Sequence, residues 1–375
     1  MSEHHDALEH LNKHLTLSDK LVAAHQSLQQ VYPFVVRIAV TLYDSETTVL
    51  KTYIDSSGDA NPLEHYQTLI DDAPSLKKLL DKGVPRVINN MITFNDDGQE
   101  HTSRIGRQGY AASYTLPMFN DGVFFGFIFF NSSKKDVFTE YVLSQIDVYG
   151  HMIALMIINE FSAIKTLTAA VKTTGHITHC RDPETGSHLD RMSRYSLIIA
   201  NAIAEKYGLT DEYIEHVFMF APLHDIGKIA IPDGVLLNPE RLNESDMEVM
   251  KTHSRKGREM IDDLVINFGL QNIEHVDVLR NIAEYHHEAI NGSGYPDGKK
   301  MDDIPLEARI VAVADVFDAL TSRRPYKQAW TNELSINKLQ QLAGETLDKD
   351  CVDALLNNMD EVERIQKQFS ENLFG

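Results

Sequence analysis

The sequence contains little cysteine and little basic charge. Its two cysteines, Cys180 and Cys351, have no paired spacing, so neither a disulfide framework nor a thiolate zinc site is expected. Lysine and arginine number 35 against 55 aspartates and glutamates, which leaves a formal net charge of −20. Because DNA binding usually needs a basic surface, we expect no DNA partner. An anionic substrate would need bound metals or a small basic cluster.

Long apolar runs and a signal pattern are also missing. The longest apolar runs, Val123–Phe130 and Met152–Ile158, are far shorter than the roughly 20 residues that span a bilayer. The opening residues MSEHHDALEH lack a basic segment followed by an apolar one. We therefore expect a cytoplasmic protein with no membrane insertion.

What is present is the composition of a globular protein, 43% hydrophobic and 24% charged. A length of 375 residues predicts two or three domains. Residues 1 to about 30 have the apolar spacing of a helix.

Residues 34–138 alternate between strand patterns and turns. Phe34–Tyr43 and Val49–Ile54 predict two strands, and residues 44–47 between them are turn-like. Ala112–Phe119 and Val123–Asn131 predict a hairpin, because the intervening Asp-Gly pair supplies the positive φ angles of a tight turn. With a short helix at 75–80 and a short strand at 86–88, this region predicts an α+β domain with an antiparallel sheet.

The order of these elements, with Leu116-Pro117-Met118 leading into Gly126-Phe127-Ile128, resembles a GAF domain over residues 15–155. The resemblance implies a sensory module at residues 1–150. Such a module either binds an unknown small ligand or serves only as a dimer contact.

A long helix is predicted from Thr139, its expected N-cap, to about Thr174. At 1.5 Å per residue it would be roughly 50 Å long. One apolar stripe follows three- and four-residue steps, and it comprises Ile146, Ile153, Ile157, Ile164, Leu167 and Val171. The stripe either packs on the sheet or forms a parallel stalk between two copies. We predict a linker stalk at 139–174 and a homodimer.

Residues 173–375 predict an all-helical domain with short loops. Thr210 and Asn243 are expected N-caps, Gly208 is expected to end a helix, and Pro305 to open one.

Residues that bind metals recur at the ends of these helices. Alone, Glu184 and His188 could be a surface pair, and His253 could be a histidine favoured by a helix dipole. Asp315 lies in an apolar stretch, where a buried carboxylate is costly unless it is paired or bound to a metal. Several apolar helices that each deliver such groups predict a multinuclear site; the candidate ligands are Glu184, His188, His224, Asp225, His253, His286, His287 and Asp315.

The ligand types restrict the metal. Imidazole and carboxylate without thiolate suit iron, manganese, nickel, cobalt or zinc. A carboxylate such as Asp225 can bridge two ions, and ions about 3.5–4 Å apart can share a hydroxide and hold a phosphate. Bound cations would also supply the positive charge that the composition lacks.

Four motifs in order resemble the HD-GYP phosphodiesterases over roughly residues 173–365. They are His224-Asp225-Ile226-Gly227-Lys228, His286-His287-Glu288, Asn291-Gly292-Ser293-Gly294-Tyr295-Pro296, and Asp315 followed by Arg324-Pro325-Tyr326-Lys327. The resemblance implies an all-helical domain that hydrolyses cyclic di-GMP to linear pGpG, to GMP, or to both, by a metal-bridging hydroxide.

The resemblance also implies a role for each ligand. His188, His224, Asp225 and Asp315 correspond to the HD-type metal ligands, with Asp225 as the bridge. His253, His286 and His287 extend the cluster to further metals. Glu184 implies a third ion. Two or three divalent ions are expected, with iron preferred and manganese as an alternative.

Substrate roles follow from the same motifs. Lys228 is expected to contact the phosphate and assist catalysis beside Asp225; alternatively it is a surface lysine that caps a helix end. Gly294, Tyr295 and Pro296 form a loop that can approach a guanine closely. Arg324 and Lys327 supply positive charge for phosphate, and Arg323 could replace Arg324.

The sequence departs from the family pattern at Ala289-Ile290-Asn291, where many members have Arg-Trp-Asp, and at Ala230, where glycine is frequent. These departures leave base recognition open. A phosphodiesterase for cyclic GMP–AMP and a non-catalytic cyclic di-GMP-binding signalling protein are therefore the alternatives. An HD-type nucleotide phosphohydrolase would leave the Gly-Tyr-Pro loop without a purpose.

Overall fold

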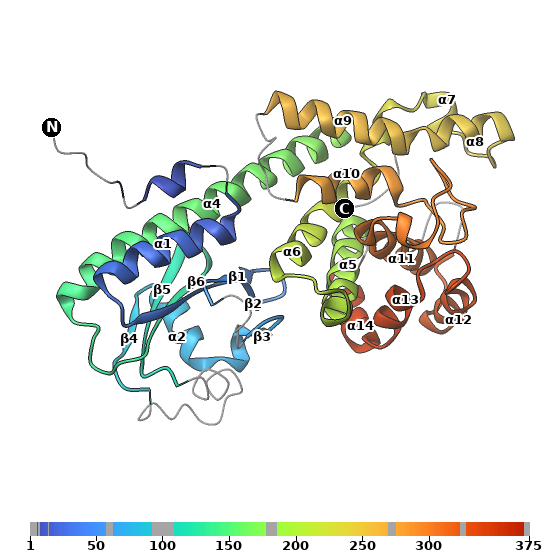
Figure 1. The fold of residues 1–375 in the computed structure, drawn as a ribbon. Coiled ribbons are helices and arrows are strands. Elements are labelled where there is room, and N and C mark those ends of the chain that lie inside the picture. Colours follow the sequence, from blue (N-terminus) through green and yellow to red (C-terminus); the bar gives the residue numbers. More distant parts are fainter. Residues whose placement is uncertain are drawn as a thin grey trace. The chain divides into compact units, whose positions relative to one another are not determined.

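The computed structural model describes residues 6, 8–13, 15–57, 63–91, 109–177, 186–268, 275–322 and 328–370 (Figure 1). The chain divides into two compact units, Met1–Ser162 and Ala163–Gly375. The expected fold class is confirmed: the first unit is α+β with an antiparallel sheet, and the described part of the second is helical.

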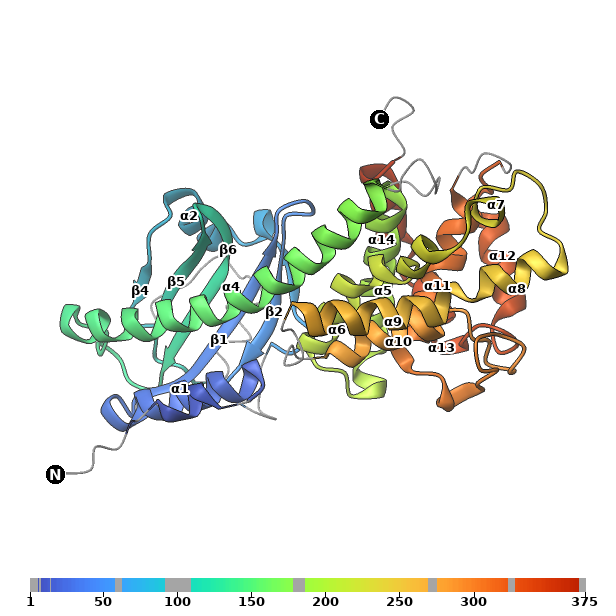
Figure 2. The same cartoon turned by 90° about the horizontal axis from the view of Figure 1, so that it is seen from above.

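The first unit is built on a six-stranded sheet in the order β3-β2-β1-β6-β5-β4, with every neighbouring pair antiparallel. Helices α1 (Leu17–Val31) and α4 (Glu140–Ile177) lie on one face of the sheet, and α2 (Pro74–Lys82) lies on the other (Figures 1 and 2). The strands are β1 (Val35–Asp44), β2 (Val49–Asp55), β3 (Gln67–Leu69), β4 (Arg86–Ile88), β5 (Ala112–Asn120) and β6 (Val123–Ser132).

The predicted hairpin is confirmed, and the two strands predicted before it also pair with each other. Asn120 pairs with Val123 across a two-residue loop, in which Asp121 and Gly122 have φ angles of 49° and 81°. This is the backbone that an Asp-Gly turn favours between twisted strands. The β1–β2 hairpin closes where the carboxylate of Asp44 accepts hydrogen bonds from the backbone of the turn.

The prediction of one helix through residue 30 is wrong before Leu17. A short 3-10 helix, Glu9–Asn12, precedes α1. Thr16 leaves the helical conformation and its hydroxyl accepts a hydrogen bond from the Asp19 amide at 2.9 Å. A side chain that satisfies an N-terminal amide in this way starts a new helix.

The long helix starts after Thr139 as predicted, and the Thr139 carbonyl accepts from the Leu143 amide at 2.8 Å. Ile146, Ile153 and Ile157 of the predicted stripe are fully buried within the first unit. A Cβ built at Gly150 would lie 2.5 Å from the side chain of Leu116 in β5, so helix and sheet are in close contact there. These side chains are therefore not available to a second copy. The side chains of Leu167 and Val171 are outside the described residues.

Residues Glu140–Thr166 of α4 are long and apolar enough to cross a membrane, with a hydropathy of 1.4 and a third of the window buried. A helix that packs one face against a sheet passes the same test, so this is weak evidence for a membrane span.

The second unit packs its helices around α5 (Gly186–Tyr207), α10 (Val276–Tyr285) and α11 (Leu306–Thr321). The predicted caps are confirmed: Thr210 and Asn243 accept from the amides of Tyr213 and Asp246. The other helices are α6 (Asp211–Phe220), α7 (Asp233–Leu236), α8 (Glu244–Lys251), α9 (His253–Asn267), α12 (Asn332–Leu342), α13 (Lys349–Leu356) and α14 (Met359–Gln368).

Replacing Gly126 in β6 with alanine is expected to lower the free energy of unfolding of the first unit by more than about 2 kcal/mol. Its φ is 153°, and a Cβ there would lie 2.0 Å from the backbone carbonyl oxygen of Thr41. Gly122→Ala is the control, since its Cβ would meet nothing within 4 Å and only the positive φ is strained, at about 1 kcal/mol. Urea denaturation monitored by circular dichroism compares the two variants; equal losses would contradict the close approach.

Candidate metal centre

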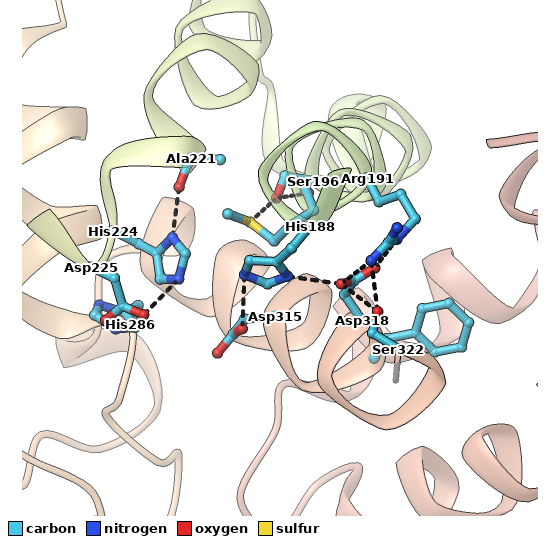
Figure 3. Close-up of polar contacts among 12 residues, drawn as sticks. His188, Arg191, Ser196, Ala221, His224, Asp225, His286, Asp315, Asp318 and Ser322 are labelled. Carbon is cyan, nitrogen blue, oxygen red and sulfur yellow. Dashed lines mark hydrogen bonds and ion pairs between the residues drawn. The ribbon is translucent and has the colours of Figure 1, made fainter. Parts of the chain in front are cut away.

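The predicted ligands come from several helical segments and meet near their ends, except for Asp315, which lies inside α11. His224 and Asp225 lie between two 3-10 helices, Ala221–Leu223 and Ile226–Ala230. His253 opens α9, and His286 and His287 follow α10. Within each of two groups the ligand atoms lie within 4.8 Å of one another. One group is Asp225, His253, His286 and His287. The other is His188, His224 and Asp315, which Figure 3 shows.

Three of the imidazoles are oriented by the backbone. The Nδ1–H groups of His224, His253 and His286 donate to the carbonyl oxygens of Ala221, Met250 and Ile282 at 2.9, 2.8 and 2.9 Å. A ring that carries its proton on Nδ1 has a lone pair on Nε2. Each Nε2 points toward the carboxylate of Asp225.

Asp225 is the centre of this arrangement. Its Oδ1 lies 3.1 Å from Nε2 of His253 and 3.6 Å from Nε2 of His286, and its Oδ2 lies 3.2 Å from Nε2 of His224. With the ring protons on Nδ1, these contacts join acceptors to acceptors, which is unfavourable unless a cation lies among them.

Orphaned buried atoms provide a test of metal binding. In the described part of the chain, Oδ1 of Asp225 and Nε2 of His253 and His286 are buried and have no hydrogen-bond partner. A buried acceptor without a partner costs about 1–3 kcal/mol. A divalent cation would satisfy all of these atoms, and the mixture of nitrogen and oxygen donors fits such ions.

The charges in the site favour the ligand forms of these groups. Burial raises the pKa of Asp225, but neighbouring positive charge, first of all the Lys228 ammonium 2.7 Å from Oδ2, outweighs it and holds the pKa well below its usual range. Burial lowers the pKa of His286 and His287, and neighbouring histidines lower that of His287 further. An ionised carboxylate and neutral imidazoles are the forms that bind metals.

Asp315 is not fully buried, contrary to the expectation from its apolar surroundings. Its side chain is 18% exposed, and its Oδ1 lies 3.9 Å from Nε2 of His188. The carboxylate that α11 buries completely is Asp318, one turn further on. It accepts a hydrogen bond from Nδ1 of His188 at 2.7 Å (Figure 3).

Two glycines of the motifs allow close backbone contacts. A Cβ on Gly227 would lie 1.9 Å from the carbonyl oxygen of His253, so α9 touches the backbone next to Asp225. A Cβ on Gly294 would lie 2.3 Å from the amide nitrogen of Ala289 and 2.5 Å from the carbonyl oxygen of His287. Both contacts hold histidine-bearing segments in place.

The Gly-Tyr-Pro loop places an aromatic ring beside the candidate metal-binding histidines. The ring centroid of Tyr295 lies 4.8 Å from that of His287. Glu288 holds the loop, because its carboxylate accepts from the amides of Asp297 and Lys299 at 2.7 and 3.0 Å. Tyr295 and Pro296 are joined by a cis peptide bond. Arg324 and Lys327, like Glu184, lie outside the described residues.

Sequence reasoning missed Arg191, Glu288, Asp318 and Ser322, which support the predicted ligands. A signal was present for two of them. Arg191 follows His188, and Asp318 follows Asp315, by three residues, which places each on the same helix face as a candidate ligand. Glu288 was part of a quoted motif, His286-His287-Glu288, but its contact with the backbone of the Gly-Tyr-Pro loop was not anticipated.

The sequence comparisons with known proteins find matches within the second unit. Residues 183–351 match the HD domain family. A cyclic di-GMP phosphodiesterase response regulator of Xanthomonas campestris is 50% identical over 51% of this chain and 47% of its own length. A 3′3′-cGAMP-specific phosphodiesterase of Vibrio cholerae is 35% identical over 52% of this chain and 36% of its own. The chain thus spans half or less of the length of these relatives.

Among solved structures, a GAF domain/HD domain protein from Geobacter sulfurreducens is similar to part of this chain, with a TM-score of 0.30 and 17% identity. The match covers 38% of this chain and 94% of that protein.

Replacing Gly227 with alanine is expected to weaken metal binding at least about tenfold, because the new methyl group would push His253 away from Asp225 and ligand distances tolerate only about 0.2 Å. Gly234→Ala in α7 is the matched control, since its Cβ would meet nothing within 4 Å. Metal content after dialysis against graded chelator, measured by plasma mass spectrometry, checks the prediction. Equal metal retention in both variants would contradict it.

Proposed function

We propose that this chain, whose residues 183–351 match the HD domain family, is a metal-dependent phosphodiesterase that hydrolyses cyclic di-GMP. The observation that carries the proposal is the convergence of buried nitrogen and oxygen acceptors on Asp225. When bound, divalent ions there would act as Lewis acids on phosphate and lower the pKa of a water molecule.

The residues of the chain then have separate roles. Asp225 would hold the ions, since its two oxygens face different imidazoles, Oδ2 that of His224 and Oδ1 that of His253. Lys228, which forms an ion pair with Asp225, keeps an ammonium group beside the ions, where it can contact a phosphate oxygen and donate a proton to the leaving 3′-oxygen. His253, His286 and His287 complete one half of the centre, and His188, His224 and Asp315 the other.

The Gly294-Tyr295-Pro296 loop binds the base in this proposal. The Tyr295 ring lies against His287, so a guanine stacked on it would hold its phosphate near the ions. Arg324 and Lys327 are proposed as phosphate contacts on the strength of the motif alone. The ions are two or three in number, with Glu184 as the ligand of a third, and iron is preferred over manganese.

A 3′3′-cGAMP substrate is the second candidate, because one relative over the same region carries that specificity in its name. The departure from the family pattern at residues 289–291 does little to favour this substrate, because two of these three side chains are buried and cannot contact a base. Ala289 and Ile290 are buried, and Ile290 packs against Ile304 and Ala308. Only Asn291 of the three is exposed.

The full chain, purified without oxygen and loaded with Fe²⁺ or Mn²⁺, is expected to convert cyclic di-GMP to linear pGpG or GMP faster than it converts 3′3′-cGAMP. Lys228→Ala should lower turnover about 10²–10³-fold with metal retained, whereas His224→Ala and Asp225→Ala should lose both metal and turnover. Lys206→Ala, which removes a surface ion pair with Asp350 in the same unit, is the control. Product chromatography is the measurement.

Binding of cyclic di-GMP by fully loaded protein without any linear product would favour a non-catalytic signalling role instead. Faster cleavage of 3′3′-cGAMP would reassign the substrate.

We further propose that the first unit is a regulatory module that dimerises through α4, on the face opposite the buried stripe. Tyr141, Val148 and Leu155 are 73, 66 and 67% exposed and lie seven residues apart. Apolar residues at this spacing form the seam of a parallel helix pair, for which a second copy of the same helix is the matching partner. A cavity of about 50 Å³ in this module is lined mainly by apolar side chains, among them Leu50, Leu63 and Phe129, and has room for only a few water-sized groups.

Replacing Leu155 with glutamate is expected to raise the dimer dissociation constant at least about tenfold, because paired charges would face each other in the seam. Leu237→Glu, which changes a 44% exposed leucine of the second unit, should have no effect. Sedimentation equilibrium of the full chain measures both; a monomeric wild type would refute the dimer.

A further inference from the structure

One metal-binding imidazole is held differently from the others. His224, His253 and His286 donate their Nδ1–H groups to backbone carbonyls of their own helical segments. The ring of His188 instead meets a carboxylate from another helix, Oδ2 of Asp318, at 2.7 Å. The orientation of His188 therefore depends on a tertiary contact between α5 and α11.

Asp318 itself is tightly held. Its side chain is fully buried, and besides His188 it receives hydrogen bonds from Nε of Arg191 at 2.6 Å, Nη2 of Arg191 at 3.0 Å and Oγ of Ser322 at 2.8 Å (Figure 3). A carboxylate that accepts from several donors, including a two-pronged guanidinium, has a single orientation.

Arg191 is anchored in turn. Its Nη2 also donates to Oγ of Ser322 at 2.7 Å, and its Nη1 donates to the backbone carbonyl oxygen of Phe369 at 2.9 Å. Phe369 is the C-cap of α14. The end of this helix therefore fixes the guanidinium of Arg191, which in turn fixes the carboxylate of Asp318.

The spacing along the two helices explains why the supporting residues lie next to the candidate ligands. His188 and Arg191 are three residues apart on α5, and Asp315 and Asp318 are three residues apart on α11. Residues at this spacing share one helix face. The candidate ligands His188 and Asp315 thus lie one turn from the supporting pair Arg191 and Asp318.

We propose that Asp318 is a positioning residue of the metal centre: held by Arg191 and Ser322, it fixes the ring orientation and tautomer of His188, so that Nε2 is presented to the ion shared with His224 and Asp315. The inference rests on the proposed metal centre. Carboxylate partners of metal-binding histidines typically contribute 10–100-fold to metal affinity.

The test is Mn²⁺ binding to the metal-free full chain, with free Mn²⁺ measured by electron paramagnetic resonance. Asp318→Asn is expected to weaken binding at one class of site about 10–100-fold and to leave the remaining sites unchanged. His188→Ala should abolish the same class of site. Ser322→Ala, which removes one donor to Asp318, should give a smaller loss in the same class.

Asp348→Asn is the matched control. Asp348 is also buried and paired with an arginine, Arg309, at 2.7 Å, but it supports α13 rather than a candidate ligand. This variant should lower thermal stability without changing the Mn²⁺ isotherm.

Wild-type Mn²⁺ binding in Asp318→Asn together with a lost site in His188→Ala would overturn the role of Asp318 alone. Wild-type binding in both variants would overturn the metal centre and this inference with it. Should Asp318→Asn fail to fold, Ser322→Ala decides: an isotherm identical to that of Asp348→Asn would refute the positioning role.

Discussion

The candidate centre of the second unit brings buried hydrogen-bond acceptors, the imidazole nitrogens and the Asp225 carboxylate, face to face. The rest of this unit has to hold them in that arrangement. The backbone carbonyls of Ala221, Met250 and Ile282 accept hydrogen bonds from the Nδ1–H groups of three histidines. The Nε2 atoms of these rings are then acceptors, and they face the carboxylate oxygens of Asp225, which are acceptors as well. Such an arrangement is costly in an apolar interior. The surrounding helices have to be stable enough to hold these groups together until cations neutralise them.

The acidic composition and the candidate centre are compatible because positive charge is concentrated where it is needed. The chain carries a net charge of −20, yet Lys228 lies 2.7 Å from the central carboxylate, and the ammonium of Lys251 lies 5.8 Å from the ring of Tyr295. Together with bound ions, these groups would make a local anion site on a protein that otherwise repels anions.

The sequence was informative where local chemistry decides the structure. The Asp121-Gly122 turn, the caps at Thr139 and Thr210, and the meeting of several histidine-bearing segments follow from short-range rules, and the structure has them. It was less informative where packing between distant segments decides. Asp315 and Asp318 occupy the same apolar stretch, and only the approach of α5 selects Asp318 for complete burial. Likewise, only the sheet reveals which face of α4 is occupied. The roles of Glu184, Arg324 and Lys327 stay predictions.

The contact at Gly227 has a consequence for how the centre tolerates change. Its missing side chain lets the carbonyl oxygen of His253 come within 1.9 Å of where a Cβ would be. The separation between the Asp225 segment and α9 is therefore a main-chain dimension, and rotamer changes cannot adjust it. Between these two segments, a cation that needs longer bonds could be accommodated only by the side chains of Asp225 and His253, because the backbone beneath them is already in contact.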